Sequence, residues 1–293
     1  MNQLSHVPQP KQEFLQQLVA DLRQVPNVTA VVLGGSYASQ THHDTSDLDI
    51  GLYYHAAAPF TIAAIRQIAN KISVKGNPVV TDFYEWGAWV NGGAWMETAV
   101  GKVDFLYRNL EQVERTIADA QQGIVQHDYD QQPTHGFYSV IYLAETRICI
   151  PLHDPGGLIA RLKRRVADYP PALKAKIILD SLWSAEFTLQ FAQNYAAQGD
   201  VYNTVGCLTR TAANLTQALF ALNETYFMRD KKVMETLAAF PILPADYVER
   251  VTAVLAHPGQ TALELQQTVM NLKAVWHTTV SLTGGFYKPK FQI

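Results

Sequence analysis

The chain has 293 residues, a formal net charge of −3 and a charged fraction of 17%, so it can fold as one large domain or two ordinary ones. A chain without a broad basic field does not bind long nucleic acid tightly, and no extended nucleic-acid surface is expected. The sequence holds no signal-peptide pattern, no apolar run long enough to cross a bilayer and no disulfide framework in its two cysteines. We therefore expect a cytoplasmic protein without a membrane partner.

The first part of the chain predicts helices that alternate with strands. Apolar residues recur at helical spacing over residues 11–23 and 62–72. Apolar, β-branched or alternating segments predict strands over residues 28–33, 46–54, 79–84, 94–100 and 102–108. The last two strands flank Gly101 and predict a β-hairpin. An α/β fold is therefore expected over residues 1–125.

From about residue 110 the apolar spacing is helical almost without interruption. It predicts a helix over residues 137–149, followed by a helix that starts with Asp154 as N-cap and Pro155 at its first position. Further amphipathic helices are predicted over residues 172–197, 201–226, 231–239, 245–256 and 262–282. Long helices joined by short loops favour an all-α helical bundle, which we expect over residues 126–293.

A tight glycine turn follows the first predicted strand, in the sequence Gly34-Gly35-Ser36. The two glycines lack a Cβ, so the backbone can turn sharply and approach a ligand closely. Ser36 can donate its hydroxyl and its backbone N–H to a phosphate group. The turn is therefore a candidate phosphate-binding site.

A pair of carboxylates follows eleven residues after the serine, in the sequence Asp47-Leu48-Asp49. Residues at i and i+2 of a strand point to the same side, so both aspartates lie opposite the apolar face. Asp104 stands between apolar residues in a later strand and calls for a cation or a partner. Three carboxylates on neighbouring strands could hold two Mg²⁺ ions. A solvated turn at Asp47 and Asp49 would not explain the regular apolar alternation that follows them.

The glycine turn, the Asp-x-Asp pair and the later strand aspartate together resemble the signature of the DNA polymerase β-like nucleotidyltransferase superfamily, over residues 28–108. The layout is similar to stand-alone bacterial members of the kanamycin and lincosamide type. Those enzymes pair a small α/β catalytic domain, built on a mixed sheet, with a C-terminal helical bundle. Residues 103–108 and 218–223 resemble an uncharacterised bacterial subgroup more closely still.

This resemblance implies roles for individual residues. Asp47 and Asp49 would bind both Mg²⁺ ions and the nucleotide, and Asp104 would bind the catalytic ion and help to activate the acceptor hydroxyl. Gly35 and Ser36 would bind the nucleotide phosphates.

The resemblance also implies a reaction. A nucleoside monophosphate, with AMP from ATP as the first expectation, would move to a hydroxyl of a small-molecule acceptor such as an antibiotic and release pyrophosphate. A homodimer is compatible with the family, whose members often complete their sites across two chains. Adenylyl transfer to a protein or an RNA, and a non-catalytic nucleotide sensor, are the alternatives.

Two further features stay open between a functional and a structural interpretation. Glu145 falls on the apolar stripe of its predicted helix, where it is either the general base of the family or the ion-pair partner of an arginine such as Arg147 or Arg210. An aromatic cluster either packs in the core, which is favoured, or forms a wall for an adenine or an acceptor ring. Its members are Phe83, Tyr84, Trp86, Trp89 and Trp95.

Overall fold

The computed structural model describes residues 4–132 and 134–291. The chain divides into two compact units. The first comprises the chain up to Ala118 with His127–Gln131 and Ser139–Asp168, and the second comprises Asp119–Gln126, Gln132–Tyr138 and the chain from Tyr169 onward. A boundary between residues 125 and 126 falls in the stretch where the two units alternate, and as a boundary between domains it stays a prediction.

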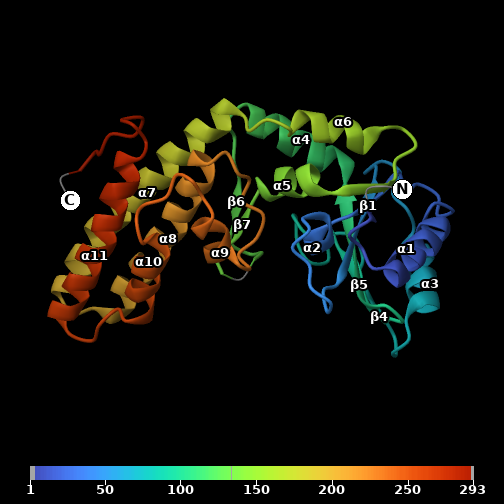
Figure 1. The fold of residues 1–293 in the computed structure, drawn as a ribbon, viewed down its shortest axis with the longest axis horizontal. Helices are drawn as coiled ribbons and strands as arrows, with labels where there is room; N and C mark the ends of the chain where they lie inside the picture. Colours follow the sequence, from blue (N-terminus) through green and yellow to red (C-terminus); the bar gives the residue numbers. More distant parts are fainter. Residues whose placement is uncertain (1–3, 133, 292–293) are drawn as a thin grey trace. The chain divides into compact units, whose positions relative to one another are not determined.

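The first unit is built on a six-stranded mixed sheet with the order β3-β4-β5-β2-β1-β8 (Figure 1). β2 and β5 are parallel, and every other neighbouring pair is antiparallel. The strands are β1 Ala30–Leu33, β2 Leu48–Tyr54, β3 Val79–Val80, β4 Gly93–Thr98, β5 Gly101–Asn109 and β8 Ile150–His153. The mixed sheet that the family resemblance implied is therefore present.

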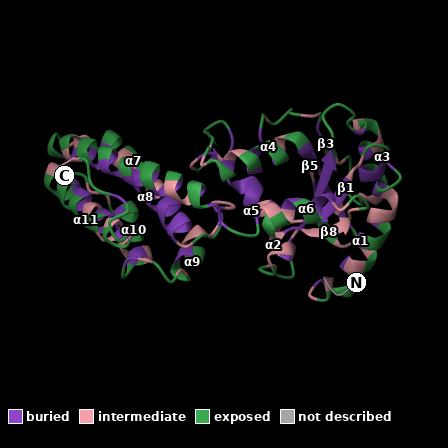
Figure 2. Cartoon of the chain, turned by 90° about the horizontal axis from the view of Figure 1, so that it is seen from above, coloured by how far each residue is buried: buried purple, intermediate pink, exposed green. Residues whose placement is uncertain are grey.

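Helices α1 (Gln9–Leu22) and α3 (Ile62–Ile72) supply apolar residues to the core of this unit. In the strands the core takes every second residue, such as Ile50 in β2 and Phe105 in β5, because successive side chains of a strand point to opposite faces. The apolar residues that the helical and strand patterns predicted therefore share one core. Figure 2 shows mostly buried strands next to helices that carry both buried and exposed residues.

The alternate residues of β2 and β5 form the opposite face of the sheet. This face carries Asp49 and Asp104 toward one end and Arg108 at the other, where it meets α5 (Ile141–Ile148). Four elements complete the description of this part of the chain: α2 Gly35–Ala38, α4 Leu110–Gln121, β6 His127–Asp128 and α6 Leu158–Arg165.

The predicted strand over residues 79–84 is too long. β3 ends at Val80, and the hydroxyl of Thr81 then accepts the N–H of Gly93 at 2.8 Å instead of the chain continuing the ladder. Tyr84 has a φ of 62°, which a strand does not allow. Residues 81–92 therefore form a loop, although their aromatic content favours a strand.

The predicted helix over residues 137–149 and the predicted start of the next helix also need correction. Phe137–Tyr138 forms the short strand β7, and α5 begins only at Ile141. α6 begins at Leu158 after Gly157, whose φ is 63°, so Asp154 is not the N-cap. The Asp154 carboxylate still accepts the N–H of Ala160 at 3.1 Å and so satisfies a free donor of that helix.

The second unit is helical, as predicted. Its helices are α7 Pro171–Ala197, α8 Val201–Leu222, α9 Val233–Ala238, α10 Tyr247–Ala256 and α11 Ala262–Ser281. α7 and α8 are joined by a short turn and pack extensively, and α11 packs on α7. A capping box between Thr261 and Glu264 fixes the start of α11. Within residues 4–132 and 134–291, no helix is both long and apolar enough to cross a membrane.

Candidate active site

The glycine turn packs directly against the first carboxylate strand. The N–H of Gly34 donates to the carbonyl of Asp49 at 2.8 Å. Gly35 has a φ of 57°, and a Cβ on it would lie 1.7 Å from the Asp49 carboxylate oxygen. No side chain fits at position 35 while Asp49 keeps this position. The turn therefore brings its backbone and Ser36, the next residue, beside a carboxylate.

The sheet brings two of the three predicted carboxylates together on one face. Asp49 in β2 is directly opposite Asp104 in the parallel strand β5, and neighbouring strands lie about 4.8 Å apart. Asp47 stands two residues before Asp49. Burial, and then the charges of Asp49 and Asp47, raise the pKa of Asp104 to about 7 against the weaker opposing effect of Lys102. These carboxylates repel one another and gain from a cation.

The donor set was tested against a divalent cation. In the described part of the chain, no group of three or more His, Cys, Asp and Glu side chains is placed to hold one ion. Mg²⁺ rarely needs such a protein cage, because it is usually bound by one or two carboxylates together with substrate phosphates. The opposed pair Asp49 and Asp104 fits that pattern in donor type and in excess negative charge. The assignment of Asp47, Asp49 and Asp104 as metal ligands stays a prediction.

The metal-free protein is expected to lose stability as the pH rises from about 4 to about 7. The pKa of Asp104 in the folded protein is about 7, above its ordinary value of 3.8, so the folded state holds the proton more tightly than the unfolded chain. The stabilisation is complete below pH 4 and is lost as the pH rises through 7. Because the side chain is only half-buried, we expect about 1–2 kcal/mol.

Thermal unfolding at several pH values measures this effect. Asp104→Asn should flatten the decline in Tm, and Mg²⁺ should raise the Tm of the unmodified protein most at pH 8. An equal decline in the Asp104→Asn variant would show that other groups cause it.

A buried lysine supports the site from behind. Lys11 is 8% exposed, and its ammonium group donates to the Tyr37 hydroxyl at 2.7 Å and to the Ser46 carbonyl at 2.8 Å. These bonds connect α1 with α2 and with the residue that precedes Asp47. The sequence gives no sign that Lys11 is buried, because a lysine at the start of an amphipathic helix is normally exposed.

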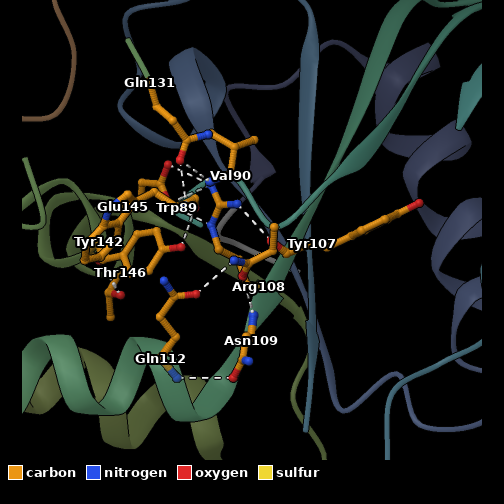
Figure 3. Close-up of polar contacts among 11 residues, drawn as sticks. Trp89, Val90, Tyr107, Arg108, Asn109, Gln112, Gln131, Tyr142, Glu145 and Thr146 are labelled. Atoms are coloured by element: carbon orange, nitrogen blue, oxygen red, sulfur yellow. Dashed lines mark hydrogen bonds and ion pairs between the residues drawn. The ribbon is translucent and has the colours of Figure 1, made fainter. Parts of the chain in front are cut away.

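Glu145 forms an ion pair with Arg108, which lies near the end of β5, the strand that also carries Asp104. The Arg108 Nε and Nη2 atoms each donate to a different Glu145 carboxylate oxygen at 2.9 Å (Figure 3). Burial alone would lower the pKa of Arg108, but Glu145, with smaller contributions from Tyr142 and Tyr53, raises that pKa overall. The predicted ion pair with an arginine is therefore present, and the arginine is Arg108. Arg108 is four residues from Asp104, or about 13 Å along the strand.

Side chains hold the loop over residues 81–92 from several sides. The Gln131 side-chain carbonyl accepts the N–H groups of Trp89 at 2.7 Å and Val90 at 3.2 Å (Figure 3). Its amide donates to the Trp86 carbonyl. The Asn91 side chain accepts the N–H of Asn109 at 2.9 Å. The loop is therefore fixed at both its middle and its end.

The aromatic cluster separates into two groups. Phe83 packs on core aromatic rings and Trp89 is 8% exposed, so core packing holds for these two. Trp86 is 49% exposed and stacks on Trp95, with ring centroids 4.0 Å apart and planes inclined by 15°. Core packing therefore does not account for Trp86.

The mixed sheet thus sets the glycine turn beside Asp49, with Asp104 opposite on the adjacent parallel strand. Residues 15–92 match the family model described as a nucleotidyltransferase domain. This part of the chain therefore carries a nucleotidyltransferase domain of the polymerase β-like superfamily, as the sequence motifs indicated, and the protein is a nucleotidyltransferase. Membership of the antibiotic-modifying subgroup stays a prediction.

Residues 142–231 match a second model, described as a domain of unknown function (DUF4037). A crystal structure of a nucleotidyltransferase-like protein from Exiguobacterium sibiricum 255-15 is similar with a TM-score of 0.46 and 10% sequence identity, covering 92% of this chain and 77% of that one. No curated protein matches the sequence.

Proposed function

We propose that this protein transfers a nucleoside monophosphate from a nucleoside triphosphate, with ATP as the expected donor, to a hydroxyl of a small-molecule acceptor, and releases pyrophosphate. The observation that carries the proposal is the placement of Asp104 directly opposite Asp49, against which the Gly35 turn is packed. That arrangement sets the backbone of the phosphate turn beside two facing carboxylates.

Two groups of residues would bind the nucleotide and its metal ions. The Gly34-Gly35-Ser36 turn would hold the β- and γ-phosphates through backbone N–H groups and the Ser36 hydroxyl. Asp47, Asp49 and Asp104 would hold Mg²⁺, which when bound neutralises the triphosphate and stabilises the attacking and leaving oxygens. The binding site would thus fix the nucleotide at its phosphates.

Asp104 would accept the proton of the acceptor hydroxyl. Its place on the open face of the sheet, opposite Asp49, would set it beside the incoming hydroxyl. As the proton leaves, a bond forms between the acceptor oxygen and the α-phosphorus. The bond between that phosphorus and the oxygen that bridges the α- and β-phosphates breaks, and this oxygen leaves with the pyrophosphate. We assign the base role to Asp104 because both carboxylate oxygens of Glu145 are engaged by Arg108.

Pyrophosphate release tests the proposed reaction. The protein is incubated with ATP, Mg²⁺ and a panel of hydroxyl compounds, and pyrophosphate release should rise above the level with water when a suitable acceptor is present. Release of orthophosphate instead would contradict the proposal. Label from the α-phosphate found on co-purified protein or RNA would favour the macromolecular alternative.

A further inference from the structure

One row of side chains crosses the open face of the sheet from the phosphate turn to an indole ring. Asp49 in β2 is opposite Asp104 in β5, and Asp104 is opposite Trp95 in β4. Directly opposed residues of neighbouring strands point to the same face. The glycine turn follows β1, on the other side of β2. Trp95 therefore lies beside Asp104 on the side away from the turn.

The Trp95 ring reaches back to Gly93 of its own strand. Gly93, two residues earlier in the strand, has no side chain, and a Cβ there would lie 2.1 Å from the Phe105 backbone oxygen and 3.0 Å from the Trp95 Cη2 atom. Trp86 covers Trp95 at a centroid distance of 4.0 Å. The pair Trp86 and Trp95, which we call the indole platform, therefore presents a broad apolar surface next to the catalytic carboxylates.

The indole platform is held in place before any ligand arrives. Gln131 binds the Trp86 carbonyl and the N–H groups of Trp89 and Val90. A half-exposed tryptophan on a loop fixed in this way loses little conformational entropy when a ring stacks on it. Trp89, from the same loop, is buried, so the loop does not need Trp86 for its own packing.

The in-line geometry of the displacement determines which ligand lies next to the indole platform. In an in-line displacement the attacking and leaving oxygens lie on opposite sides of the phosphorus. If the turn holds the leaving pyrophosphate, the acceptor oxygen enters from the side of Asp104 and Trp95. The surface beside that entry is apolar and flat, which suits the face of a ring better than an open chain.

We propose that the indole platform binds the ring of the acceptor, a hydroxylated cyclic compound whose hydroxyl reaches Asp104. This inference rests on the proposed function and adds the chemical class of the acceptor to it. Sugar rings and aromatic rings share the required flat face.

The test compares ring compounds with open-chain polyols of equal hydroxyl number as acceptors. Probes are hexopyranosides, aminocyclitols, nucleosides and phenols, with pyrophosphate release from ATP and Mg²⁺ as the readout. Trp86→Leu and Trp95→Leu should raise the KM of the best ring acceptor about tenfold and leave the KM of ATP within about twofold. Trp86→Phe should restore most of the loss.

Trp183→Leu is the matched control, because Trp183 is 44% exposed and also stacks on an aromatic ring; it should leave both KM values unchanged. The inference is overturned if open-chain polyols are the better acceptors. It is also overturned if the platform variants raise the KM of ATP and not that of the acceptor, which would place the nucleobase there.

Release of pyrophosphate to water separates this inference from the proposed function, because that reaction needs no acceptor ring. Should the water reaction be absent, the same ring compounds are titrated against tryptophan fluorescence. Quenching that Trp86→Leu removes supports the indole platform without turnover, and no quenching by any ring compound contradicts it.

Discussion

Replacement of Asp49 by asparagine should lower nucleotidyl transfer by about a hundredfold to a thousandfold. The change removes the negative charge opposite Asp104 but keeps the shape of the side chain. Its carbonyl, which accepts the N–H of Gly34, belongs to the backbone and is unaffected. The fold should therefore persist while metal-dependent turnover is lost. Pyrophosphate release at saturating Mg²⁺ and the Tm of the same sample measure the two effects.

Asp44→Asn is the control for this change. Asp44 is an exposed aspartate in the same loop, upstream of Asp47, and its replacement removes an equal charge at a position without an assigned role. Turnover in this variant should stay within about twofold of the unmodified protein, since exposed charges are well screened. Full activity in Asp49→Asn would refute the site, and an equal loss in Asp44→Asn would refute its specificity.

Replacement of Glu145 by alanine should destabilise the protein by about 2–3 kcal/mol. The Arg108 side chain is 8% exposed, and removal of its partner leaves a buried charge unpaired. The expected loss lies below the full cost of a broken buried pair because Glu145 itself is about one-third exposed. Urea unfolding of both proteins measures the difference.

Two comparisons sharpen the interpretation of Glu145. Glu224→Ala breaks the exposed pair with Lys174 and should cost less than about 1 kcal/mol. Glu145→Gln keeps hydrogen-bond acceptance toward Arg108, and its pH–rate profile should keep the limb that Asp104 sets. A general base at position 145 would instead abolish that limb while leaving stability nearly unchanged.

The glycine turn and the faces on which the aspartates lie could be predicted from local sequence. The spacing of Asp47 and Asp49 and the apolar neighbours of Asp104 predict all three on one face, because side chains alternate along any strand. The structure places Asp49 and Asp104 opposite each other on that face. The glycine turn needs only the absence of a Cβ at Gly35. The common location of Asp49 and Asp104 then follows from the parallel pairing of β2 with β5, of which the sequence predicted only that the strands are neighbours.

Long-range packing decided what the sequence alone did not reveal. The partner of Glu145 is Arg108, 37 residues earlier, and only the register of β5 beneath α5 brings the two together. Residues 79–84 have strand-forming side chains, yet Thr81 and the aromatic loop after it are held by bonds to distant residues such as Gln131. The stacking of Trp86 on Trp95 depends on that same loop.

The central claim is that the α-phosphorus of the nucleotide moves to a hydroxyl, and double labelling tests it most directly. The protein is incubated with Mg²⁺, the best ring acceptor and ATP labelled at either the α- or the γ-phosphate. We expect the α-label on the acceptor and the γ-label in pyrophosphate, with both products absent in Asp104→Asn. Transfer of the γ-label, or its release as orthophosphate with the α-label left in ADP, would contradict the claim.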